Sequence, residues 1–176
     1  MDNKMLKLFI SYSHNDAHYV QDFIRHIAPL KDNGMLDIWY DKNITAGDDF
    51  WNKIEEHLAD RDIICCFISS YYISSSACKK EMQKALELKQ KKGVHVIPII
   101  LSPCAWMDFL DVKSLLAIPS DGKPVSDFAS HDEAWVDVYS HIKKVSEKYL
   151  KAKKLSFFSM STLTPKSSNS CFNLLD

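Results

Sequence analysis

The run "DIICCFISS" at residues 62–70 decides the fold class of this chain. Its apolar residues follow one another without alternation, which is typical of a strand buried on both faces of a parallel sheet. Two similar runs, "KLFISYS" at 7–13 and "VHVIPIILS" at 94–102, lie before and after it, and a shorter one, "LDIWYD", occupies 36–41. The sequence therefore predicts three strands buried on both faces and a fourth, shorter strand.

Helical patterns separate these strands. Apolar residues recur every three or four positions in each connecting segment, so that they lie on one face of a helix. The residues concerned are Val20, Phe23, Ile24 and Ile27, then Trp51, Ile54 and Leu58, then Cys78, Met82, Ala85 and Leu86. Strands that alternate with helices predict a doubly wound parallel sheet with right-handed crossovers and helices on both faces.

Local signals support the same boundaries. Gly34 and Gly93 follow helical segments, where a left-handed residue ends a helix, and "SSS" at 74–76 offers hydroxyl groups that can cap the start of the third helix. Pro98 lies inside the fourth strand and has no N–H to donate to a neighbouring strand. We therefore expect that strand to lie at the edge of the sheet or to bulge there.

The composition restricts the function classes. The 176 residues are 46% hydrophobic and 26% charged, which describes one domain with a sizeable core. A formal net charge of -1 argues against nucleic acid as the main partner. No apolar run reaches the ~20 residues of a membrane span, and "MDNKMLK" lacks the apolar stretch of a signal peptide. We expect a cytoplasmic protein that has no membrane partner.

The cysteines indicate the redox state of the protein, and the composition along the chain indicates the limits of its domain. Five cysteines are an odd number and lack paired-ligand spacing, so they predict reduced thiols and neither disulfides nor a zinc site. We expect an N-terminal extension at 1–5 and one domain at 6–150 that closes with an amphipathic helix over 131–150. Residues 151–176 become rich in Ser and Thr, which favours a tail or the stub of a linker.

Missing motifs exclude several enzyme classes. None of the four glycines builds the phosphate-binding patterns GxGxxG or GxxxxGK[ST], and no serine lies in GxSxG. The clustered aspartates of a phosphoacceptor receiver domain are missing, because the first and third strands end in Ser-Tyr-Ser and Ser-Ser-Tyr. His14 and His18 lack a third ligand at suitable spacing, so we interpret them as polar residues of a helix start and expect no metal.

The polar residues at these strand ends predict a binding site. In a doubly wound sheet, ligands bind beyond the carboxyl ends of the strands, where the strand order reverses. Residues 11–15 and 69–76 would line this crevice, and the third helix would direct its N-terminus into it, which favours phosphate groups. Glu81 lies in the early turns of that helix. It is either an acid that complements the helix dipole or a catalytic carboxylate that faces the strand ends.

Four segments, in order, resemble the Toll/interleukin-1 receptor (TIR) domain family and its bacterial members in particular. They are "LFISYSHND" (8–16), "IWYDKNITAGDDFW" (38–51), "DIICCFISSYYISSSACKKEMQKAL" (62–86) and "VIPII" (96–100). The resemblance covers residues 6–106 well and 107–150 loosely. It implies an α/β fold, namely a flavodoxin-like sheet of about five strands.

The resemblance also implies an activity. Many members of the family cleave NAD+ between nicotinamide and ribose, with a glutamate in a pattern like S-x-W-C-x-x-E. The corresponding stretch is "SSACKKE" at 75–81, which gives Glu81 the catalytic position and puts Ala77 where the tryptophan is usual. The implied products are nicotinamide and ADP-ribose or a cyclic isomer, with no cofactor and with a role in bacterial anti-phage defence. Other members are adaptors that only assemble, which is the alternative function.

Five further residues match family positions that bind the substrate. Ser13 and His14 match polar positions that approach the ribose and phosphates, whereas the alternative for His14 is a capping or exposed residue. Asp41 and Phe50 begin and end the family's BB loop, and Trp106 follows the fourth strand. Phe50 and Trp106 resemble aromatic residues that stack on the dinucleotide, and the alternative for both is packing in the core.

The same resemblance implies self-assembly. In the family, the BB loop of one subunit commonly completes or opens the site of the next. Gly47 supplies a flexible turn in this loop, and Ala46 replaces a frequent proline, which leaves the loop less restrained. We therefore expect other TIR domains as partners, a sensor or effector protein as the trigger, and weak activity of the free monomer.

Overall fold

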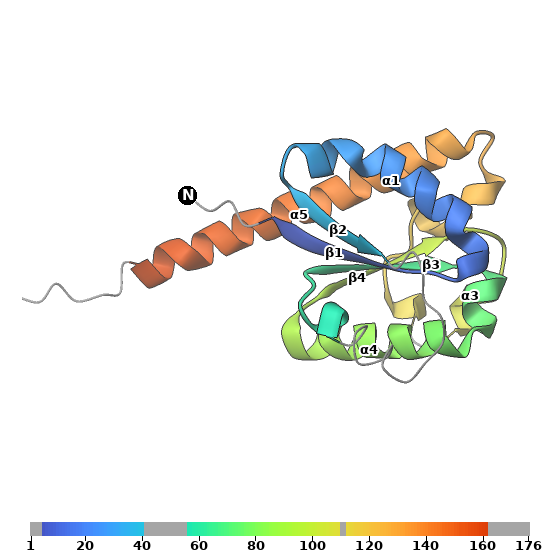
Figure 1. Cartoon of the computed structure of the whole chain (residues 1–176), viewed down its shortest axis with the longest axis horizontal. Coiled ribbons are helices and arrows are strands. Elements are labelled where there is room, and N and C mark those ends of the chain that lie inside the picture. The colour runs from blue at the N-terminus through green and yellow to red at the C-terminus, as the bar shows by residue number, and fades with distance from the viewer. Residues whose placement is uncertain (1–4, 41–55, 110–111, 162–176) are drawn as a thin grey trace, which may run out of the picture.

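A four-stranded parallel sheet forms the centre of the computed structural model, which describes residues 5–40, 56–109 and 112–161 (Figure 1). The strands lie in the order β2-β1-β3-β4, and all three neighbouring pairs are parallel. Their bounds are Leu6–Ser11 for β1, Leu36–Tyr40 for β2, Ile63–Ile68 for β3 and His95–Ile100 for β4. The predicted doubly wound parallel sheet is therefore confirmed.

Strand β3 is buried along its whole length. Ile63, Cys65 and Phe67 point into the hydrophobic cluster on one face of the sheet. The alternate residues Ile64, Cys66 and Ile68 point into the cluster on the other face. Since the side chains on both faces of this strand are buried among apolar residues, its sequence is an unbroken apolar run.

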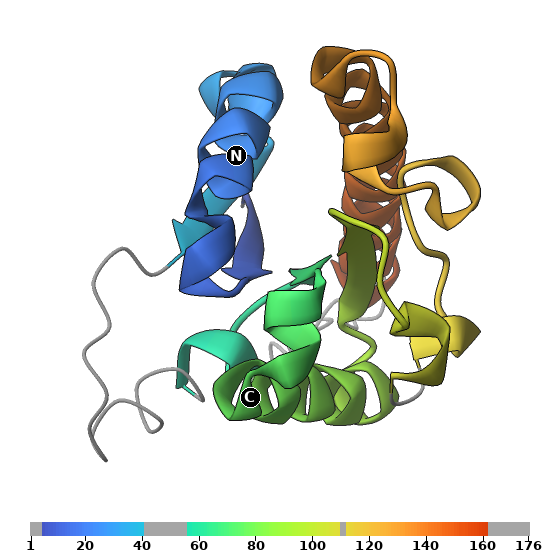
Figure 2. The same cartoon turned by 90° about the vertical axis from the view of Figure 1, so that its right-hand side faces the viewer.

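Helices cover both faces of the sheet. Helices α1 (Ala17–Asp32) and α5 (His131–Ser161) lie on one face, and α3 (Ser70–Ser74) and α4 (Ser76–Lys92) lie on the other (Figure 2). In the described part of the chain, five short 3-10 turns lie between β1 and α1 and between β4 and α5. These turns are η1 (His14–Asp16), η2 (Trp106–Asp108), η3 (Val112–Ser114), η4 (Ser120–Gly122) and η5 (Val125–Asp127).

The ends of helix α4 follow the predicted signals. The Ser75 hydroxyl accepts a hydrogen bond from the Cys78 N–H at 3.3 Å and caps the start of the helix. Gly93 ends it in the left-handed region at φ 71°, where a residue with a Cβ is disfavoured. Both capping predictions are confirmed, and they fix the point at which the helix starts beside the strand ends.

The edge beyond β4 differs from the prediction of about five strands. In the described part of the chain, β4 is the last strand, as Pro98 predicts. A fifth strand is reduced to one bridge, in which the Ile100 N–H donates to the Ile118 carbonyl at 2.8 Å and the Ile118 N–H donates to the Pro98 carbonyl at 2.9 Å. Pro119 follows directly and has no N–H with which to extend the pairing.

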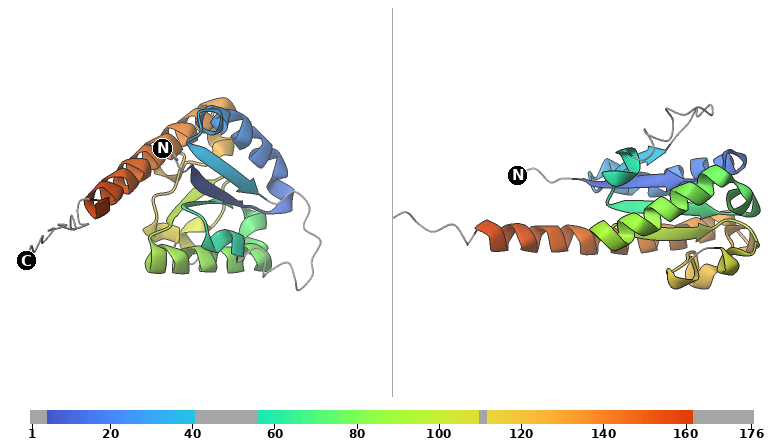
Figure 3. Two further views of the ribbon diagram at one scale, coloured as in Figure 1. Left: turned by 60° about the vertical axis from the view of Figure 1, so that its left-hand side comes forward. Right: turned by 90° about the horizontal axis from the view of Figure 1, so that it is seen from below.

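Helix α5 also differs from its predicted extent. It continues to Ser161 and extends past the sheet instead of ending near residue 150 (Figure 3). The added residues "KAKKLSFFSMS" at 151–161 contain neither Gly nor Pro, so nothing in them breaks a helix. Lys153 forms an ion pair with Asp62 at 2.5 Å. The start of the predicted tail at 151 therefore lies within this helix, and the other predicted segment limits stay predictions.

Trp135 allows a test of how α1 and α5 pack on their face of the sheet. Its ring is fully buried and lies 5.8 Å from Phe23 and 6.1 Å from Phe67, so it joins α5 to α1 and to β3. We expect Trp135→Ala to lower the free energy of unfolding by about 3–5 kcal/mol. The neighbouring Val136 is 58% exposed, and Val136→Ala is the matched control, with an expected change within about 0.5 kcal/mol. Urea unfolding measures both, and equal losses would contradict this packing.

Candidate functional site

Buried polar side chains collect at the carboxyl ends of β1 and β3. Among the described residues, six polar or charged side chains are buried, and five of them come from this end of the sheet. The five are Ser11, Ser13, Asp16, Ser69 and Glu81. This is the point where the strand order reverses, since β2 lies on one side of β1 and β3 lies on the other. The fold thus concentrates its buried polarity where a doubly wound sheet binds ligands.

Glu81 holds the centre of this cluster. It lies in the second turn of α4 and is 8% exposed. The Ser11 hydroxyl, at the end of β1, donates a hydrogen bond to Glu81 Oε2 at 2.5 Å. The Ser11 oxygen also lies 2.8 Å from the hydroxyl of Tyr72, which comes from α3. A carboxylate in this position is held by the sheet and by two helices.

The thiols around this carboxylate have raised pKa values. Burial raises the pKa of Cys66 and of Cys78 to about 12, and the Glu81 charge adds to the rise in both. Burial likewise raises the pKa of the Tyr72 phenol well above its ordinary value. At neutral pH both thiols and the phenol keep their protons, so neither cysteine can serve as a nucleophile. The chemistry available to the cluster is that of its carboxylates.

A second buried carboxylate belongs to Asp16, and the sequence analysis did not single it out. It precedes α1 but makes no side-chain bond to the start of that helix. It instead accepts a hydrogen bond from the Ser69 hydroxyl at 2.6 Å, and Ser69 accepts one from the Tyr72 N–H at 3.1 Å. The nearest signal in the sequence is the acid in "SHND", which reads locally as a helix cap.

Ser13 and His14 differ in their surroundings. Ser13 is 8% exposed, and its carbonyl accepts a hydrogen bond from the Asp16 N–H at 2.7 Å, which forms the turn η1. His14 is exposed, and its ring lies 5.9 Å from that of Tyr12. Both follow the end of β1, while Ser11 makes the direct contact with Glu81. Their substrate-binding roles stay predictions.

Trp106 is half-buried and packs against the cluster beneath α4. Its ring covers Gly122, where an added Cβ would come within 2.7 Å of the indole Cζ2. The Trp106 segment follows β4 and brings Cys104 close enough to the Asp16 charge for that charge to raise the pKa of the thiol, after the larger effect of burial. Trp106 is thus partly a core residue and partly a surface at the same end of the sheet.

The other predicted loop residues are not placed by the structure. Asp41, Phe50, Ala46 and Gly47 lie outside the described residues. Their roles in binding NAD+ and in assembly therefore stay predictions.

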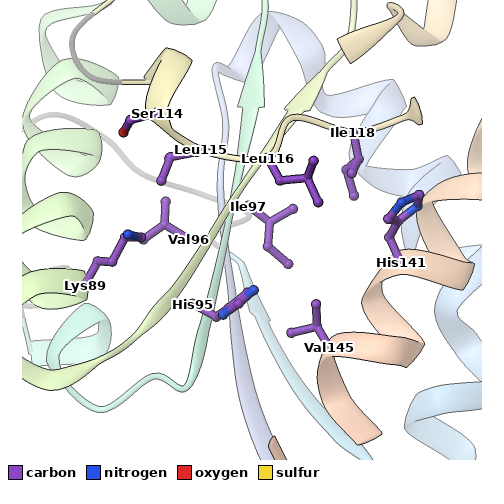
Figure 4. Close-up of a pocket in the computed structure, with 10 residues that line it drawn as sticks. All are labelled: Lys89, His95, Val96, Ile97, Ser114, Leu115, Leu116, Ile118, His141 and Val145. Atoms are coloured by element: carbon purple, nitrogen blue, oxygen red, sulfur yellow. The ribbon is translucent and has the colours of Figure 1, made fainter. Parts of the chain in front are cut away.

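A separate hollow runs along the outer edge of β4, away from Glu81. It has a volume of about 180 Å³, and Figure 4 shows His95, Ile97, Ile118 and His141 around it. It contains none of the predicted site residues.

In the parts of the chain that the structure describes, no group of three His, Cys, Asp or Glu side chains is arranged to hold a metal ion. No helix of those parts combines the length and apolarity that crossing a bilayer requires.

Comparison with known proteins assigns the family. The family model described as a TIR domain matches residues 8–138. The chain belongs to the TIR domain family. A bacterial relative, the uncharacterized protein y4lF of Sinorhizobium fredii, is 34% identical over 143 residues, which are 81% of this chain and 44% of that protein. This TIR domain thus spans less than half the length of that relative.

Solved structures agree on the fold. The TIR domain of the Toll-related receptor TRR-2 from Hydra magnipapillata is similar with a TM-score of 0.53 and 19% identity, over 77% of this chain and 97% of that one. The RPS4 and RRS1 TIR domain heterodimer gives a TM-score of 0.54 and 9% identity, over 80% and 97%. These likenesses confirm the predicted TIR fold, although the described sheet has four strands.

The contact between Trp106 and Gly122 can be tested with a matched pair of glycines. Gly122 and Gly93 have nearly the same φ, 72° and 71°, but an added Cβ at Gly93 meets nothing within 4 Å. Gly93→Ala should lose about 1–2 kcal/mol of unfolding free energy through backbone strain alone. Gly122→Ala should lose a further ~1–3 kcal/mol through overpacking against Trp106. Equal losses in urea unfolding would show that the ring does not rest on Gly122.

Asp16 should make stability depend on pH. Burial raises the pKa of its carboxyl above the ordinary value of 3.8, against the hydrogen bond from Ser69 and the charge of His18, which lower it. As the pH rises from 3.8 toward the raised pKa, the unfolded chain loses this proton before the folded protein does, so the free energy of unfolding falls. Asp16→Asn cannot titrate. Its stability relative to the wild type should therefore increase across that window and stay constant above it.

Urea unfolding of both proteins at a series of pH values measures this difference. A difference that does not change with pH would show that the Asp16 carboxyl has the same proton affinity in the folded and unfolded states.

Proposed function

We propose that this TIR domain cleaves NAD+ between nicotinamide and ribose, with Glu81 as the catalytic carboxylate. The observation that carries this proposal is the buried contact between Glu81 and Ser11 at the reversal point of the sheet. A carboxylate that only complemented the dipole of α4 could lie in solvent, where its charge is hydrated at no cost. Here it is withdrawn from water and directed at the end of β1, which supports a role toward a bound cation.

The proposed reaction needs one carboxylate. The bond between the ribose C1′ and the nicotinamide nitrogen breaks, and its electron pair neutralises the pyridinium, so nicotinamide leaves without a proton from a general acid. The ribose then carries an oxocarbenium-like positive charge, which a fixed carboxylate in a water-poor site stabilises. Water adds to C1′ and releases a proton to give ADP-ribose, or an adenine nitrogen adds to give a cyclic isomer.

The surrounding groups support a mechanism in which Glu81 is the single catalytic carboxylate. Glycosidases that must protonate a leaving group use two carboxyl groups. The second carboxylate here, Asp16, is hydrogen-bonded to Ser69 and is 3% exposed. The thiols of Cys66 and Cys78 keep their protons. Glu81 is therefore the group that we assign to the reacting ribose.

Assembly belongs to the same proposal. RPS4 and RRS1 are described as a TIR domain heterodimer. We propose that this TIR domain likewise pairs with other TIR domains, and that a sensor or effector protein brings the copies together. The setting that we propose is the bacterial cytoplasm, where loss of NAD+ or a cyclic product would halt a phage infection.

The decisive experiment measures nicotinamide release from NAD+ at high protein concentration, with and without a crowding agent. We expect Glu81→Gln to lower kcat by ~10²–10³-fold, because the variant loses the charge that stabilises the transition state. Glu87→Gln is the matched control on the same helix, where the carboxylate is partly exposed and lies 3.6 Å from Lys91. It should keep full activity, and both variants should stay folded by circular dichroism.

Two results would count against the proposal. Equal turnover by the wild type and Glu81→Gln would remove Glu81 from the mechanism. A wild type that releases no nicotinamide even when crowded, but pairs with another TIR domain, would favour the adaptor function.

A further inference from the structure

Two buried hydrogen-bonded pairs at the strand ends meet on the same tyrosine. On one side, Ser69 donates to Asp16 at 2.6 Å and accepts from the Tyr72 N–H at 3.1 Å. On the other side, the Tyr72 hydroxyl lies 2.8 Å from the Ser11 oxygen, and Ser11 donates to Glu81 at 2.5 Å. The two carboxylates are therefore joined through Tyr72, which is fully buried.

Counting protons fixes the direction of the bonds that join Tyr72, Ser11 and Glu81. A serine hydroxyl has one proton to donate. Ser11 donates this proton to Glu81, so the bond between Tyr72 and Ser11 requires Tyr72 as the donor. The phenol keeps its proton at neutral pH, since burial raises its pKa well above the ordinary value. Tyr72 and Ser11 therefore form a donor chain that ends on the Glu81 carboxylate.

The same count applies to Ser69. Its proton goes to Asp16, which leaves the oxygen lone pairs free to accept the Tyr72 N–H. This bond caps the start of α3, a helix of only five residues, and holds the backbone that carries the phenol. The tyrosine ring is further held by an edge contact with Phe109, with ring centroids 6.1 Å apart. Asp16 thus orients the Ser69 hydroxyl so that its oxygen accepts the hydrogen bond that caps α3.

Stability alone does not explain the carboxylate at Asp16. It is 3% exposed, and it does not cap the helix that follows it. Among the described residues, none of the ion pairs involves Asp16. Burying such a charge costs free energy that the hydrogen bond from Ser69 and the charge of His18 offset only in part, since the pKa of Asp16 stays raised. A group that costs stability, and whose partner Ser69 holds the backbone of the tyrosine that contacts Ser11, fits a role in placing Glu81.

We propose that Asp16 is a positioning residue for Glu81. It acts in sequence through Ser69, Tyr72 and Ser11, and it fixes the distance between the carboxylate and the end of β1. The catalytic consequence rests on the function proposed above, whereas the positioning of Tyr72 does not. Asp16 itself makes no contact with substrate in this scheme.

The first experiment tests whether Asp16 and Ser69 hold the backbone of Tyr72, and it does not require NAD+ cleavage. Hydrogen exchange of the Tyr72 amide, followed by NMR, should become about tenfold faster in Asp16→Ala and in Ser69→Ala, because the bond that protects this amide is weakened. Asp16→Asn keeps an oxygen acceptor for Ser69 and should accelerate exchange less. The Gly93 amide, which donates to the Lys89 carbonyl at the far end of α4, is the internal reference and should not change.

The second experiment tests the consequence by a double-mutant cycle on NAD+ cleavage. Asp16→Ala and Ser69→Ala should each lower kcat about tenfold, with KM within about twofold of the wild type, because substrate binding is retained and the carboxylate is misplaced. In the Ser69→Ala background, Asp16→Ala should cause no further loss, since the path through Ser69 is already broken. Tyr72→Phe, which removes only the hydroxyl, should lower kcat, whereas Tyr139→Phe is the matched control on α5, which covers the other face of the sheet.

Each outcome decides one of the two proposals. Unchanged exchange of the Tyr72 amide in Asp16→Ala would overturn the positioning role even if the wild type cleaves NAD+. Independent, multiplicative losses of kcat in the double mutant would overturn it as well. A wild type that does not cleave NAD+, with exchange accelerated as expected, would overturn the proposed function and support the positioning of Tyr72 by Asp16.

Discussion

Burial of β3 on both faces is the constraint on which the rest of the structure depends. Its six residues are fully buried and alternate between the two hydrophobic clusters. A strand in that position must have partners on both edges, which β1 and β4 provide, and helices above and below. Since both faces of the sheet pack against apolar clusters, buried polar side chains are disfavoured along β3 and lie instead at or beyond the ends of β1 and β3. The site is therefore confined to the carboxyl ends of the strands.

This confinement explains why polar groups there come in connected pairs. Ser11 and Ser69 end β1 and β3 at a place closed by helices, and each hydroxyl donates to a carboxylate. Asp16 and Glu81 are both buried, so neither can be satisfied by water alone. A buried carboxylate that is held in this way costs stability and gains a fixed position. A fixed negative charge is what the proposed cleavage of NAD+ requires, because positive charge moves from the pyridinium ring to the ribose in the transition state.

The sequence predicted the elements better than the contacts between them. The continuous apolar runs identified β1, β3 and β4, and Ser75 and Gly93 marked the ends of α4. The described sheet has four strands where about five were predicted, because Pro119 limits the pairing of Ile118 to one bridge. Helix α3 was not predicted, because a five-residue helix has no periodicity to detect.

Patterning and local signals let the sequence by itself determine the fold class and the position of Glu81 in the third helix of the prediction, and four of its segments resemble the TIR family. Only the tertiary structure decided what Glu81 and Asp16 contact. Ser11 and Glu81 are 70 residues apart, and Asp16 and Ser69 are 53 apart. Periodicity and capping describe neighbours within a few positions along the chain, whereas these bonds exist because two parallel strands end side by side. The position of Asp16 in "SHND" is typical of a helix cap, but its carboxylate instead accepts a hydrogen bond from Ser69, which follows the neighbouring strand β3.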